Sequence, residues 1–129
     1  MSDRLRFRTP IYRVDGKFKR FEFWHCEDGF LEVARTLLVD DNATFGTSEQ
    51  CTGLKDKNGR HIYEGDIIQH DTAAGPKCWP VVFKNGCFVF PYESGNAWLG
   101  KVIEHCPYDS GVVVVGNIHE KPELLERNK

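Results

Sequence analysis

Long apolar runs are missing from this chain of 129 residues. The lack argues against a membrane-spanning helix, which needs about 18 or more consecutive apolar residues. The first residues are charged but have no apolar stretch behind them, as a secretory signal would have. We therefore expect a cytoplasmic protein that makes no use of a membrane.

Metal-binding clusters are missing too. The five cysteines are scattered and include no pair at the close spacing of a zinc site: Cys26, Cys51, Cys78, Cys87 and Cys106. Asp56 and Glu64 suggest a calcium loop, but the Gly and Glu fall at loop positions four and nine, where an EF-hand needs six and twelve. We predict no metal and no cofactor, and a site assembled from distant residues stays open.

Catalytic motifs are equally scarce. Ser94 and Ser110 stand near glycines but lack the Gly-x-Ser-x-Gly pattern of a nucleophile elbow. No glycine-rich phosphate loop and no obvious carboxylate pair occurs. An enzyme is therefore the least favoured of three function classes, behind an interaction module and a nucleic-acid-binding module.

The chain as a whole also lacks a strong charge of either sign, because its formal net charge is −2. Residues 1–20 nevertheless hold seven basic and two acidic side chains, a net of +5, which leaves −7 for the rest. Arg4, Arg6 and Arg8 alternate with Leu5 and Phe7, so a strand would put the arginines on one face. This face is the candidate nucleic-acid site; the alternative is a solvated strand face whose neighbouring aromatic residues point into the core.

Short alternating segments separated by Gly, Asn and Asp are what the sequence does contain, and they predict β-strands. Asp15-Gly16, Glu64-Gly65 and Lys84-Asn85-Gly86 are predicted turns, and a bulge is expected near Lys19. Residues 40–50 and 71–80 are expected to be loops, and residues 98–106 a strand. Residues 112–115 fit a buried central strand.

These elements predict a mostly β fold. We expect an antiparallel meander with an SH3-like or barrel-like C-terminal half and a short C-terminal helix beginning at Pro122. Residues 30–39 match both strand and helix templates, so that choice stays open. The expected organisation is one domain over residues 1–129, with an N-terminal β region over 1–49 and a barrel-like region over 50–129.

Two motifs carry a family resemblance: residues 50–68 (QCTGLKDKNGRHIYEGDII) and residues 114–125 (VVGNIHEKPELL). Both are similar to segments of the YopX family, and Arg6-Phe7-Arg8 is similar to the opening strand of that family. The resemblance is thin over residues 9–49. It implies a phage or prophage context and a β fold, and it implies no reaction.

The central motif allows two interpretations. Its turns, its apolar residues and a backbone-bonding Asp56 explain it as a structural segment. Alternatively, Lys55, Asp56, Tyr63 and Glu64 form an interaction surface. We predict a non-catalytic interaction or structural module that self-associates or binds a phage or host protein, with nucleic-acid binding as the second choice.

All five cysteines should be reduced thiols in the native protein, because they are scattered and a cytoplasmic location keeps thiols reduced. Mass spectrometry under non-reducing conditions should give the mass of the fully reduced chain. A stoichiometric loss of two hydrogens would contradict this expectation.

Overall fold

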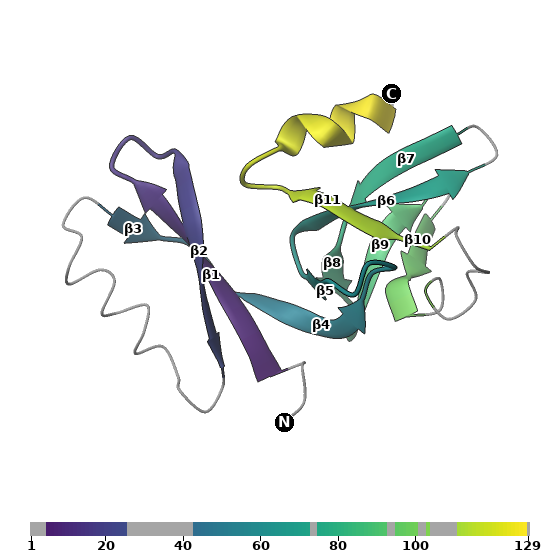
Figure 1. The fold of residues 1–129 in the computed structure, drawn as a ribbon, viewed down its shortest axis with the longest axis horizontal. Coiled ribbons are helices and arrows are strands. Elements are labelled where there is room, and N and C mark those ends of the chain that lie inside the picture. The colour runs from purple at the N-terminus through teal and green to yellow at the C-terminus, as the bar shows by residue number, and fades with distance from the viewer. Residues whose placement is uncertain are drawn as a thin grey trace. The chain divides into compact units, whose positions relative to one another are not determined.

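The computed structural model describes residues 5–25, 43–72, 75–92, 95–100, 103 and 111–128. Strands make up 64% of these residues and pair in antiparallel fashion, so the mostly β prediction is confirmed. The chain folds as two compact units, Met1–Cys51 and Thr52–Lys129 (Figure 1).

The first unit is built on a β-hairpin. Strands β1 (Arg6–Arg13) and β2 (Phe18–His25) pair from Arg6–His25 to Tyr12–Phe18, and β3 (Ala43–Phe45) joins β1. The start of β4 (Glu49–Lys55) pairs with the other end of β1. The predicted turn at Asp15-Gly16 closes the hairpin, and the expected bulge is present because the register skips Lys19.

The second unit contains two three-stranded antiparallel sheets and the β4–β5 hairpin. One sheet has the order β11-β6-β7, from strands Val113–Asn117, Asp66–Thr72 and Gly75–Pro80. The other has the order β10-β9-β8, from Gly95–Trp98, Cys87–Tyr92 and Val82–Lys84. Strand β5 (His61–Tyr63) pairs with β4. One sheet curves as a half-barrel.

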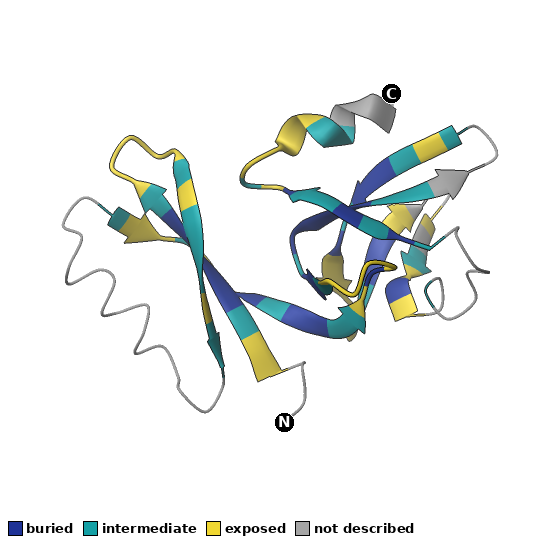
Figure 2. Cartoon of the chain, in the orientation of Figure 1, coloured by how far each residue is buried: buried dark blue, intermediate teal, exposed yellow. Residues whose placement is uncertain are grey.

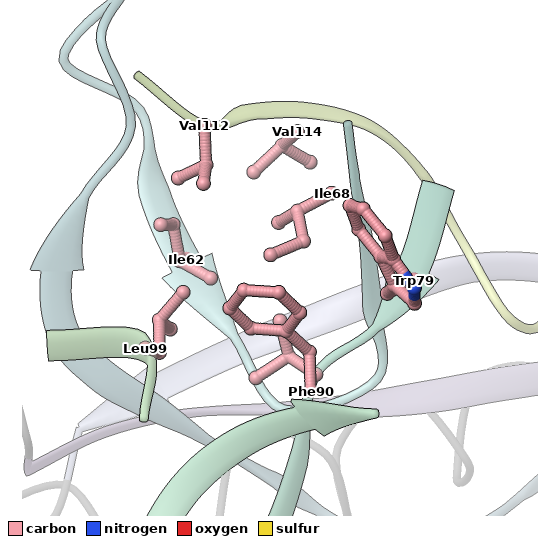
Figure 3. Packing of buried hydrophobic residues seen from close by; sticks show 8 residues of the cluster. Ile62, Ile68, Trp79, Phe90, Leu99, Val112 and Val114 are labelled. Carbon is pink, nitrogen blue, oxygen red and sulfur yellow. The ribbon is translucent and has the colours of Figure 1, made fainter. Parts of the chain in front are cut away.

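The core of the second unit is a single apolar cluster drawn from both sheets and from the segments beside them (Figure 3). Its members are Ile62, Ile68, Trp79, Val81, Phe90, Leu99, Val112 and Val114. Trp79 and Phe90 lie with ring centroids 5.4 Å apart. Burying one large apolar side chain contributes about 1.5–3 kcal/mol, so this cluster is the main source of stability in the unit.

Several sequence predictions are wrong. Residues 43–45 and 49–50 are strands, although a loop was expected over 40–50. Residues 71–80 include the end of β6 and all of β7, because Pro76 and Pro80 lie on an edge strand that tolerates a missing N–H. Residues 112–115 lie in or beside β11, which is an edge strand of its described sheet and not a central one.

The C-terminal segments also differ from expectation. Near the predicted strand 98–106, the described residues 95–98 form a strand and the described residues 99, 100 and 103 are helical. The predicted C-terminal helix is not confirmed, because Pro122–Asn128 forms a 3₁₀ helix. Residues 30–39, with their open choice of strand or helix, lie outside the described residues.

Two tight turns follow from residues that accept a positive φ. Asn85 and Gly86 have φ values of 53° and 84°, which defines a type I′ hairpin between β8 and β9. Gly65 has a φ of 87° and is buried; its N–H donates to the Val81 carbonyl oxygen at 2.8 Å. The Glu64-Gly65 turn thus joins β5 to β6 and also contacts the chain before β8.

Replacing Gly65 with Val should destabilise the protein by about 1–3 kcal/mol, because a β-branched residue is strained at positive φ. Thermal unfolding followed by circular dichroism measures the change. Gly95→Val is the matched control, because Gly95 has no positive φ and an added Cβ would meet nothing within 4 Å. Equal melting temperatures for the two variants would contradict the strain argument.

Candidate interaction surfaces

The central motif is organised by one buried carboxylate. Asp56 Oδ1 accepts the backbone N–H groups of Asn58 and Arg60, each at 2.9 Å. Its Oδ2 accepts the N–H of Val114 at 3.0 Å, from a strand 58 residues away in sequence. Asp56 is 6% exposed. Its role is therefore to fix the turn between β4 and β5 and to attach it to β11.

The four residues of the predicted interaction surface do not form a surface. Asp56 and Tyr63 are buried, Glu64 is half-buried and Lys55 is exposed. The backbone N–H of Tyr63 donates to Asp66 Oδ2 at 2.8 Å. The Asp66 carboxylate, like that of Asp56, therefore accepts a hydrogen bond from the backbone. The alternative interpretation, a turn-rich structural segment with Ile62 and Ile67 in the interior, fits these contacts.

The predicted basic face is wrong at Arg8. This residue is 2% exposed, and its Nε lies 2.8 Å from Glu49 Oε1 in a buried ion pair. Its guanidinium carbon also lies 4.0 Å from the centroid of the Phe21 ring. Arg8 lies on the same strand face as Arg6, as the alternation predicts. It is nevertheless buried, because its side chain pairs with Glu49, which is 41 residues later in the sequence. Arg6 is exposed, and Arg4 lies outside the described residues.

The buried ion pair has a tyrosine neighbour. Burial raises the pKa of Tyr12, and the negative charge of Glu49 raises this pKa further. Both effects favour the neutral phenol, which needs less solvation than a phenolate. Tyr12 also packs on Gly46, where an added Cβ would come within 2.9 Å of the ring. These contacts make the region around Arg8 a packed structural site.

The register of the β1–β2 hairpin places aromatic and cationic residues on one face. Cross-strand partners share a face, and the pairs are Arg6–His25, Arg8–Phe23 and Pro10–Phe21. Phe21 and Phe23 have ring centroids 6.0 Å apart, and Phe23 is 58% exposed. We call this set, with Phe23 and Phe21 at its centre, the aromatic face.

A second exposed apolar group lies on the sheet β10-β9-β8. Strand β8 is an edge strand in the described order, and its three residues are all exposed (Figure 2). Val82, Val89 and Trp98 form one cross-strand row, in which Val82 is 38% and Trp98 56% exposed. Phe83, 49% exposed, lies edge-on to Phe88 on the opposite face. We call Val82, Phe83 and Trp98 the β8 surface.

Sequence reasoning missed both groups. No prediction was made for the exposed aromatic residues of the described strands, which are Phe23, Phe45, Phe83 and Trp98. The type I′ turn at Asn85-Gly86 makes Phe83 and Phe88 cross-strand partners, so this pairing follows from the sequence. The order of the strands in the sheet does not. Strand β8 is exposed because it lies at an edge, which only the fold shows.

Chemistry that needs a cluster of ligands has little support here. In the described ranges, no group of three or more His, Cys, Asp or Glu side chains is placed to hold a metal ion. Cys51, Cys78 and Cys87 are free thiols. Helices in the part of the chain that the structure describes are too short or too polar to span a membrane.

Comparison with known proteins identifies the family. The family model described as YopX protein matches residues 19–126, so the chain belongs to the YopX family. The match includes most of residues 9–49, where the resemblance of the sequence was thin, and leaves out Arg6-Phe7-Arg8. No curated protein matches the chain.

Solved structures with a similar fold include one crystal structure. It is the crystal structure of protein EF1440 from Enterococcus faecalis, with a TM-score of 0.54 and 21% sequence identity. The match covers 92% of this chain and 97% of that protein. The likeness concerns the fold.

Asp56 should matter for stability, because its replacement leaves three backbone N–H groups without their acceptor. Asp56→Ala should lower the free energy of unfolding by about 1–3 kcal/mol or more. Asp56→Asn should cost less, since one amide oxygen can still accept the two N–H groups of the turn. Urea unfolding measures both, and Lys55→Ala, at an exposed neighbour, is the control. Equal stability of all three variants would contradict the structural role.

Proposed function

We propose that this protein is a non-catalytic interaction module of a phage or prophage that self-associates through the β8 surface. The observation that supports this proposal most is an edge strand with all three residues exposed, two of them large and apolar. Open apolar strand edges favour pairing with another chain, and proteins usually protect them. Here the single charge on the strand is Lys84 at its end.

The backbone of β8 suits a second copy of itself. The closing pair of a two-residue hairpin, Lys84–Cys87, is a hydrogen-bonded pair, so the next pair, Phe83–Phe88, is a non-hydrogen-bonded one. The N–H and C=O of Phe83 therefore point away from β9, toward the outer edge. Two β8 strands related by a two-fold axis at Phe83 would exchange both hydrogen bonds.

Side chains are compatible with this pairing. An antiparallel register centred on Phe83 puts Val82 of one copy opposite Lys84 of the other, so the two ammonium groups do not face each other. The two Phe83 rings become cross-strand neighbours, and aromatic pairs contribute about 0.5–1.5 kcal/mol beyond the area they bury. Trp98 and Val82 add apolar area on the other face of the sheet.

The non-catalytic part of the proposal is supported by the roles of the buried acids. Asp56 and Asp66 accept backbone N–H groups, and Glu49 pairs with Arg8. A general acid or base must be able to reach a substrate. These three carboxylates are instead occupied by contacts within the fold.

Phe83→Lys should shift the protein toward the monomer, because two ammonium groups would face each other across the two-fold axis. Sedimentation velocity over a concentration series should show the association constant falling by about tenfold or more. Phe45→Lys is the matched control, because Phe45 is also 49% exposed but lies on β3 in the first unit.

Three outcomes are informative. Loss of the dimer in Phe83→Lys alone supports the β8 surface. A wild-type chain that is monomeric throughout the series, or a dimer that survives in both variants, contradicts it. Thermal unfolding of both variants separates a loss of self-association from a loss of fold.

A further inference from the structure

We propose that the aromatic face of the β1–β2 hairpin binds single-stranded nucleic acid, with bases stacking on Phe23 and cations of the same hairpin contacting phosphates. This site is independent of the β8 surface and goes beyond self-association. It also differs from the predicted basic face, because Arg8 supports an aromatic ring and does not contact the ligand.

Register brings the two kinds of side chain together. The sequence suggested that the arginines of β1 and the aromatic residues of the hairpin lie on opposite faces. The pairing shows otherwise for β2, since Arg8 faces Phe23 and Arg6 faces His25 across the two strands. Phe21 and Phe23 are therefore on the arginine face, where stacking platforms for single strands have their aromatic residues and cations.

The two phenylalanines differ in exposure, and the difference assigns their roles. Phe23 is 58% exposed, whereas Phe21 is half-buried with Arg8 over its ring. Phe21 also packs edge-on to Phe18 at 4.9 Å. In the row of Phe18, Phe21 and Phe23, the first two rings are thus packed against neighbouring side chains, and Phe23 at the end of the row is exposed. Phe23 is the ring that offers a face to a base.

The charge of the hairpin complements a polyanion. Arg8 and Arg20 have carboxylate partners in Glu49 and Glu22, at 2.8 and 2.9 Å. Arg6, Arg13, Lys17 and Lys19 are exposed. Asp15, 3.9 Å from Arg13, is the one remaining acid between residues 5 and 25. Arg6 lies on the aromatic face at the open end of the hairpin, and Lys19 lies at the bulge next to Phe18. Arg13 and Lys17 lie opposite each other beside the turn and continue the face of Ile11.

The size of the hairpin fits a short site. From Arg6 to Arg13, β1 extends about 23 Å at roughly 3.3 Å per residue, which suits a site of about four nucleotides. A base stacks on an aromatic ring only when it is not already stacked in a duplex. The geometry therefore favours a single strand over a double-stranded partner.

Fluorescence anisotropy with a labelled 12-nucleotide oligothymidylate and the full chain tests the stacking contact. Phe23→Ala should raise Kd by roughly 5- to 150-fold, and Phe23→Tyr should retain binding because it keeps the ring. Phe45→Ala is the matched control. Phe45 is exposed to a similar extent and pairs with Ile11, which places it on the other face of the hairpin sheet.

Salt dependence tests the phosphate contacts. If Arg6 and Lys19 contribute about two contacts, the log–log salt slope should be near −1.4, and affinity should fall about sevenfold between 50 and 200 mM salt. Arg6→Gln/Lys19→Gln should remove most of this slope. Lys55→Gln/Lys57→Gln changes the net charge equally from exposed positions in the second unit and should leave the slope unchanged.

The proposal is overturned by no detectable binding at 50 mM salt, by equal losses in Phe23→Ala and Phe45→Ala, or by equal losses in the two double variants. Tighter binding of a duplex of the same length would also overturn it, because the stacking contact would then be absent. Since Phe83→Lys lies in the other unit, its effect on self-association can be read without reference to these results.

Discussion

The carboxylate of Asp56 holds the second unit closed, because it bonds to the turn at Asn58 and Arg60 and to Val114 near the end of the chain. A second link runs beside it, where the Lys57 N–H donates to the Val112 carbonyl oxygen at 3.1 Å. Val112 and Val114 both belong to the apolar core. Closing a loop of this length costs conformational entropy, which the core must offset. The Asp56 carboxylate fixes the position of β11, so that Val112 and Val114 can be buried in the core.

The first unit depends on a different balance of forces. Few apolar side chains of its described residues are buried, whereas the polar residues Arg8, Thr9 and Glu49 are. Trp24 Nε1 donates to Thr9 Oγ1, which also hydrogen-bonds Ser48, and Phe7 stacks on Trp24 at 4.5 Å. Breaking a buried ion pair such as Arg8–Glu49 leaves an uncompensated charge, at a typical cost of about 3–5 kcal/mol. Buried polar pairs and stacked aromatic rings therefore supply much of the stability of this unit, whereas an apolar cluster supplies it in the other unit.

The contrast explains which features the sequence could predict. The turns at Asp15-Gly16, Glu64-Gly65 and Asn85-Gly86 were predicted because their φ angles restrict the residue locally. The bulge at Lys19 followed from the phase of Phe18 against Phe21. Arg8 was misplaced because its environment is set by Glu49, and β7 was missed because Pro76 and Pro80 are acceptable only at an edge. The order of strands in a sheet determines which strands lie at an edge and which distant residues become partners. This order cannot be predicted from any one segment of the sequence. The aromatic face and the β8 surface both depend on sheet pairing, so neither was predicted.

The two proposed surfaces would reinforce each other if both are used. A dimer formed through β8 would carry two aromatic faces, and each is proposed to hold about four nucleotides. A strand long enough to reach both would bind the second face at the effective concentration set by the nucleotides between them. Each contact could then be weak, as the few exposed cations of the hairpin require, while the dimer binds long strands in preference to short ones. This coupling needs no contact between the two units. The affinity of Phe23 for a base in a long strand would then depend on whether β8 is paired with β8 of a second copy.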